Sequence, residues 1–146
     1  WEHALTDMLT LHDYSGPADL ALHFRSVKAA LSARAADHDA YNPGFGYRGE
    51  PVLVTEFGGV RLSGGSGWGY ADARDPGQLL DTYSRLVDAL MSQGPVEGFC
   101  YTQLTDVQQE INGLLTFDRV PKVEPGLIRT ATETPKDASR AVENDS

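Results

Sequence analysis

The spacing of hydrophobic residues predicts two amphipathic helices. After Asp75 and Pro76, a good N-cap and first-turn pair, one apolar face continues to a stop at Gly94 and Pro95. That face holds Leu79, Leu80, Tyr83, Leu86, Val87, Leu90 and Met91. It predicts a helix over 75–93. A second stripe consists of Leu20, Phe24, Val27 and Leu31 and predicts a helix over about 18–36.

Short apolar runs predict three strands that alternate with these helices. They lie at 7–14, 51–56 and 98–103, and the middle run, Val52 to Val54, is typical of a strand buried on both faces. A short helix is expected near 124–132, and 37–50 and the glycine-rich 57–74 are expected to be loops. Strands that alternate with helices favour an α/β fold with parallel strands and right-handed crossovers.

Composition narrows the functional class. The 146 residues suffice for one domain, and the net charge of −9 argues against a nucleic-acid partner. No run is long and apolar enough to cross a membrane, so no membrane partner is expected. The single cysteine, Cys100, excludes an internal disulfide and is interpreted as a buried hydrophobic residue. The chain starts with Trp1 rather than Met, so we expect it to be part of a longer protein.

Polar residues follow all three predicted strands. Parallel strands place their C-terminal ends at one rim, where α/β folds carry their chemistry. Glu56 ends the middle strand and precedes a turn through Gly58 and Gly59. A single pocket could therefore contain Glu56 with His12, Asp13, Tyr14, Tyr101 and Gln103. Trp68 and Tyr70 lie in the long loop that follows Glu56.

Three segments in order resemble glycoside hydrolase family 2, which contains β-galactosidases, β-glucuronidases and β-mannosidases. They are Val54-Thr55-Glu56-Phe57-Gly58-Gly59, Gly98 to Val107 (GFCYTQLTDV) and Gln109 to Arg119 (QEINGLLTFDR), within a similarity that spans roughly 1–130. The resemblance implies that 1–132 is the C-terminal portion of a (β/α)8 TIM barrel, carrying strands six to eight. Residues 133–146 have the composition of a disordered tail. The N-terminal remainder of the same enzyme would then be a partner of this chain.

The resemblance also implies roles for individual residues. The family's nucleophile falls on Glu56, and a tyrosine that hydrogen-bonds it falls on Tyr14. The aromatic floor of the sugar site falls on Tyr101, where many members have Trp. The family's acid/base is the Glu of an Asn-Glu pair, and this chain contains no such pair. The isolated chain is therefore expected to be inactive.

Several residues expected near Glu56 have both a functional and a structural interpretation. A hydrogen bond from Tyr14 would keep Glu56 ionised, and otherwise Tyr14 is a packing residue. Trp68 either stacks on a sugar or fills the loop, and His12 either contacts sugar hydroxyls or supports its neighbours. Gln103 is expected to bind hydroxyls. Asp106 and Glu110 are favoured as loop-ordering residues over cation ligands, and no metal site or cofactor is identifiable.

The substrate is expected to be a neutral sugar. Glucuronidases of the family carry an Asn-x-Lys element, whereas the matching stretch here is Ile111-Asn112-Gly113. The function favoured is therefore a retaining β-glycosidase, with a β-galactoside first. The alternatives are a non-catalytic carbohydrate-binding relative of the same fold and an unrelated α/β-barrel enzyme. Oligomeric state and compartment stay open, with the cytoplasm favoured over secretion.

Overall fold

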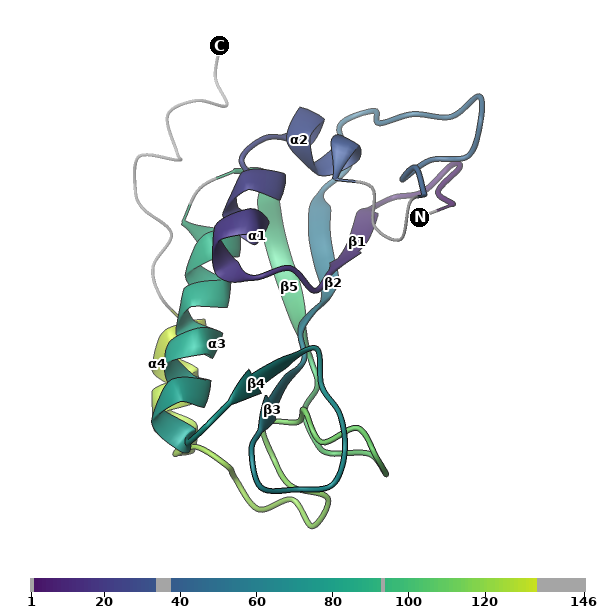
Figure 1. Ribbon diagram of the computed structural model, residues 1–146. Coiled ribbons are helices and arrows are strands. Elements are labelled where there is room, and N and C mark those ends of the chain that lie inside the picture. The colour runs from purple at the N-terminus through teal and green to yellow at the C-terminus, as the bar shows by residue number, and fades with distance from the viewer. Residues whose placement is uncertain (1, 34–37, 93, 134–146) are drawn as a thin grey trace.

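The chain forms a parallel β-sheet with helical crossovers (Figure 1). The computed structural model describes residues 2–33, 38–92 and 94–133. The sheet has three strands in the order β1-β2-β5, and both pairings are parallel. These strands are β1 (Leu9–Asp13), β2 (Val52–Gly58) and β5 (Val96–Thr102). The predicted alternation and parallel pairing are confirmed, while closure into a barrel stays a prediction.

The helix predicted over 75–93 is confirmed as α3 (Pro76–Met91). The Asp75 side chain caps it by accepting a hydrogen bond from the Gln78 backbone N–H. Its apolar stripe enters the core through Leu79, Tyr83, Leu86, Val87 and Leu90. The short helix expected near 124–132 is α4 (Pro125–Thr132), where the Glu124 side chain accepts from the Leu127 N–H. Residues 134–146 of the expected tail lie outside the described residues.

The single helix predicted over 18–36 is instead two short ones, α1 (Pro17–His23) and α2 (Val27–Ser32). The first ends at Phe24, and Ser26 then starts the second because its Oγ accepts a hydrogen bond from the Ala29 N–H at 3.1 Å. The apolar stripe survives the break, since Leu20 and Phe24 are buried and Val27 and Leu31 pack against the same core. Residues 34–37 lie outside the described part of the chain.

The two faces of the sheet differ in burial. Leu9, Leu11, Val52 and Val54 join the core with residues of α1 and α3, which lie on one side of the strands (Figure 1). The alternate positions are less covered, and Cys100 on β5 is exposed. The prediction of a buried Cys100 is therefore wrong, because successive strand residues point to opposite faces and the described helices cover only one. No helix among the described residues could span a membrane.

The segment 57–74, predicted to be a loop, contains two short parallel strands. They are β3 (Val60–Leu62) and β4 (Ala71–Ala73). Gly58 has φ 88°, and a Cβ there would lie 2.2 Å from Cε2 of Tyr101, so the turn before β3 needs glycine. Arg61 Nε lies 2.6 Å from Asp72 Oδ1 and links the two strands. This ribbon positions the connecting loop that carries Trp68.

Candidate active site

Glu56 lies near the end of β2, where the pairing with both neighbouring strands is irregular. Tyr14 donates a hydrogen bond from its hydroxyl to Glu56 Oε2 at 2.8 Å, and His12 Nδ1 lies 3.2 Å from the same oxygen. Among the residues that the structure describes, none donates a hydrogen bond to the other oxygen, Oε1. The Glu56 side chain is 44% exposed. One carboxylate oxygen is thus held, and the other is open.

The pKa of Tyr14 is raised, and the largest cause is burial of its hydroxyl. The hydrogen bond to Glu56 and the charge of that carboxylate raise it further, while a side-chain hydrogen bond with Thr102 acts in the opposite direction. A tyrosine with a raised pKa keeps its proton over the physiological pH range. Tyr14 is therefore a permanent donor to Glu56.

Three aromatic rings contact one another in series, starting from Tyr14, the donor to this carboxylate. Tyr70 stacks on Tyr14 with ring centroids 3.6 Å apart and an interplanar angle of 13°. Trp68 meets Tyr70 edge-on at 5.4 Å. Trp68 and Tyr70 are 41% and 51% exposed, so both present ring surface to solvent. We call Tyr14, Tyr70 and Trp68 the aromatic wall; it offers apolar surface suited to one face of a sugar ring.

Asp13 lies between His12 and Tyr14 but has its own partners. Its Oδ2 lies 2.6 Å from Nδ1 of His23, at the end of α1, and its Oδ1 accepts the Ser15 N–H at 2.8 Å. The carboxylate therefore ties α1 to the turn after β1. His23 thereby anchors the segment in which His12 and Tyr14, on either side of Asp13, contact Glu56.

Tyr101, on β5 beside Phe57, is held by packing contacts. Its ring meets Phe57 and Tyr83 edge-on, with centroids 5.5 and 5.0 Å away. Its hydroxyl oxygen accepts a hydrogen bond from the Val60 N–H at 3.1 Å. Burial raises the pKa of Tyr101 to about 12. These contacts are those of a residue that packs against Gly58, and the role of Tyr101 as the floor of a sugar site stays a prediction.

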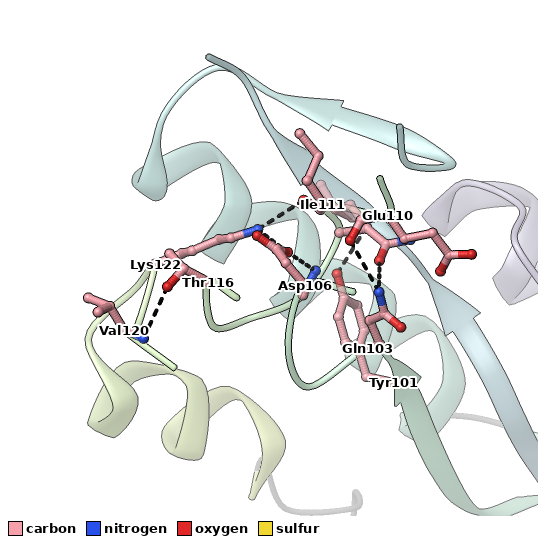
Figure 2. Close-up of polar contacts among 11 residues, drawn as sticks. Tyr101, Gln103, Asp106, Glu110, Ile111, Thr116, Val120 and Lys122 are labelled. Carbon is pink, nitrogen blue, oxygen red and sulfur yellow. Dashed lines mark hydrogen bonds and ion pairs between the residues drawn. The ribbon is translucent and has the colours of Figure 1, made fainter. Parts of the chain in front are cut away.

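Gln103 is engaged by the loop that follows β5. Its Nε2 donates to Asn112 Oδ1 at 2.7 Å and, more weakly, to the Glu110 carbonyl at 3.5 Å (Figure 2). Asn112 is fully buried, and its Nδ2 has no hydrogen-bond partner among the described residues. Asn112 was missed as a site-organising residue because an Asn-Gly pair after an apolar residue predicts only a turn.

Asp106 orders the loop after β5. Its Oδ1 accepts hydrogen bonds from Lys122 Nζ at 2.6 Å and from the Gly113 N–H at 2.8 Å (Figure 2). Lys122 also donates to the Ile111 carbonyl at 2.9 Å. This geometry agrees with the loop-ordering role preferred for Asp106. In the described parts of the chain, no group of three or more His, Cys, Asp and Glu side chains could hold a metal ion.

Comparisons with known proteins show a likeness of fold. No family model and no curated sequence matches the chain. Among solved structures, β-glucuronidase from Bifidobacterium dentium, complexed with coumarin-3-O-glucuronide, is similar with a TM-score of 0.53 and 20% identity. A β-glucuronidase from Faecalibacterium prausnitzii has a TM-score of 0.54 and 19% identity. Each match covers 90% of this chain and 22% of the other. The chain thus shares a mixed α/β fold with part of these glycosidases and spans about a fifth of their length.

Proposed function

We propose that this chain is the C-terminal portion of the catalytic barrel of a retaining β-glycosidase related to glycoside hydrolase family 2. Glu56 is the nucleophile. The observation that carries the proposal is the state of its carboxylate: Tyr14 and His12 both contact Oε2, while Oε1 is left open among the described residues. A nucleophile needs this combination of a fixed orientation and an unshared attacking oxygen.

The reaction proceeds by two displacements. Oε1 of ionised Glu56 attacks the anomeric carbon, the C–O bond to the leaving group breaks, and a covalent glycosyl-enzyme forms. Water then cleaves that ester linkage and regenerates the carboxylate. The Tyr14 hydroxyl stabilises the negative charge on Oε2 and fixes the rotamer. A second carboxyl group, about 5 to 5.5 Å away in retaining enzymes, must protonate the leaving group.

The remainder of the enzyme supplies that second carboxyl group and closes the barrel. Three parallel strands in sequential order are expected for strands six to eight of a (β/α)8 barrel. The incompletely covered face, with Leu53 half-buried and Cys100 exposed, supports further strands and an interior layer in the whole protein. The likeness to a fifth of two much longer β-glucuronidases supports the same arrangement.

The cationic side chains of the described residues favour a neutral sugar as the substrate, and a β-galactoside is the first choice. A glucuronide would need a cation for its carboxylate. Lys122 already binds Asp106 and the Ile111 carbonyl. Arg61 binds Asp72 and the Gly67 carbonyl. The aromatic wall provides the surface on which the apolar face of a pyranose would stack.

The test is Glu56→Gln in the full-length protein. We expect kcat on nitrophenyl β-galactoside to fall by at least about 10⁴-fold, because the amide cannot form the glycosyl ester. The melting temperature should stay close to that of the wild type. Glu133→Gln, at the exposed end of α4, is the matched control and should leave turnover unchanged. Wild-type turnover by Glu56→Gln would exclude Glu56 as nucleophile.

Two further outcomes separate the alternatives. Faster turnover of the nitrophenyl β-glucuronide would overturn the neutral-sugar assignment but not the role of Glu56. Binding of galactosides by the full-length wild type without any turnover would instead identify a carbohydrate-binding relative.

A further inference from the structure

Lys122 is a buried cation without a part in the proposed chemistry. The Lys122 and Asp106 side chains are 7% and 10% exposed, and their Nζ and Oδ1 atoms are 2.6 Å apart. Removing two charges from water is costly, so such a pair persists where geometry and further hydrogen bonds compensate. Here those bonds are from Lys122 to the Ile111 carbonyl and from the Gly113 N–H to Asp106. The ammonium thus has a fixed place under the 106–113 loop (Figure 2).

Ile111 links this ammonium directly to the aromatic wall. Its carbonyl accepts from Lys122 Nζ at 2.9 Å, while its N–H donates to the Trp68 carbonyl at 3.1 Å. The Trp68 N–H in turn donates to the Gln109 carbonyl at 2.8 Å. Both backbone polar groups of Trp68 are therefore held by the segment that Lys122 anchors.

Close packing makes this link stiff. A Cβ on Gly67 would lie 2.5 Å from the Gln109 carbonyl oxygen and 2.9 Å from side-chain carbons of Ile111. The loop before Trp68 therefore rests directly on 109–111, with no space between the two backbones. A shift of Ile111 should move Trp68, because the two backbones are in contact and hydrogen-bonded to each other.

We propose that Lys122 is a positioning residue for sugar binding, acting through Ile111 to fix Trp68 in the aromatic wall. The proposal rests on the proposed function only in taking the ligand of the wall to be the apolar face of a glycoside. Lys122 itself touches no substrate. Its effect is therefore expected in substrate affinity, whereas Glu56 governs the chemical step.

The mechanical half of the proposal is tested by hydrogen exchange on the full-length protein. Lys122→Met should accelerate amide exchange about 10-fold or more both in 105–113 and in 63–70, as expected when a local anchor is lost. Lys28→Met, an exposed lysine of α2, is the control and should change neither segment. Acceleration confined to 105–113, or no acceleration at all, would overturn the link to Trp68. Hydrogen exchange does not require turnover, so its result tests the link between Lys122 and Trp68 whether or not the protein is a glycosidase.

The effect of losing the Lys122–Asp106 ion pair must be separated from the effect of losing the hydrogen bond to Ile111. Lys122→Met causes both, because it leaves the buried Asp106 carboxylate without its cation. In the double variant Asp106→Asn/Lys122→Met, the new amide oxygen can still accept the Gly113 N–H. This variant should recover the melting temperature, yet leave 63–70 exchanging rapidly, since the Ile111 carbonyl still lacks its donor. Restoration of both properties would show that the pair matters only for stability.

The affinity half is tested by steady-state kinetics on a nitrophenyl β-galactoside. Loss of a well-placed ring contact should raise KM about 5-fold in Lys122→Met with kcat within about 2-fold. Trp68→Ala should raise KM similarly, and adding Lys122→Met to it should have little further effect, because both act through one ring. Additive effects on KM, or a loss in kcat alone, would contradict the proposal. Failure of Glu56→Gln to lose activity would instead remove the proposed function, while the exchange result would still decide the link.

Discussion

The ends of β2 and β5 are neighbours in the sheet but use their polar residues in opposite ways. At the end of β2, Glu56 receives contacts from Tyr14 and His12, both supplied by the end of β1. At the end of β5, the Tyr101 hydroxyl accepts from the Val60 N–H, and the Gln103 amide donates to Asn112 and to the Glu110 carbonyl. At the end of β2, neighbouring side chains converge on the Glu56 carboxylate. At the end of β5, the polar side chains hold β3 and the following loop in place.

The difference shows that a place on the rim does not by itself determine which partner a side chain takes. The pairing of β1 with β2 shifts between Leu11 and His12. A shift of this kind re-aims the following side chains. Directly after this shift, both His12 and Tyr14 contact Glu56. After β5, the chain returns as a loop whose buried Asn112 accepts from Gln103, so that the amide is already engaged.

The largest effect that this comparison predicts concerns Tyr14, which follows β1. Tyr14→Phe removes a hydrogen bond to a carboxylate, and such bonds contribute about 1.5 to 3 kcal/mol. We expect kcat/KM of the full-length enzyme to fall by roughly 10- to 100-fold. Tyr83→Phe is the control, because its hydroxyl bonds Thr132 Oγ1 rather than Glu56. Equal activity losses in Tyr14→Phe and Tyr83→Phe would mean that Tyr14 has no special relation to Glu56.

Tyr101 should instead affect stability at high pH. Burial raises its pKa from 10.0 to about 12, so the folded state keeps this proton where the unfolded chain has lost it. The stabilisation is complete below pH 10 and declines as the pH rises toward 12. At pH 11 the loss from this group is about 1.4 kcal/mol.

Urea denaturation of the wild type and of Tyr101→Phe at about pH 9 and pH 11 measures this effect. The variant should lose less stability between the two pH values than the wild type. Its kcat/KM at neutral pH should stay within about 3-fold of the wild type, since Tyr101 packs beneath Gly58. Identical pH slopes in both proteins, or an activity loss as large as that of Tyr14→Phe, would erase the contrast between the two strand ends.

Sequence patterns predicted the elements with strong periodicity. The α3 stripe and its Asp75 cap were predictable because seven apolar residues keep one face and a capping residue precedes them. The break between α1 and α2 was not, because Leu20, Phe24, Val27 and Leu31 keep helical spacing across it while Ser26 restarts the helix through a local hydrogen bond. β3 and β4 were missed because three residues are too few to show a period.

For the candidate site, too, some features could be predicted from the sequence and others could not. Glu56 and its closeness to Tyr14 and His12 were anticipated, since the ends of parallel strands meet at one rim. The hydrogen bond of the Gln103 amide depends on Asn112, and the proposed anchoring of Trp68 depends on Lys122, which is 54 positions further along the chain. Contacts between loops so far apart leave no periodic signal. Burial of Cys100 failed as a prediction because an apolar run does not reveal whether both faces of its strand are covered.

The most direct measurement is to trap the reaction on the full-length protein with a 2-fluoro β-galactoside carrying a good leaving group. The fluorine slows both displacements, and the good leaving group speeds up only the first, so the glycosyl-enzyme should accumulate. Peptide mass spectrometry should then find one fluorosugar attached to Glu56, and Glu56→Gln should remain unlabelled. Stoichiometric labelling of any other residue would contradict the central claim.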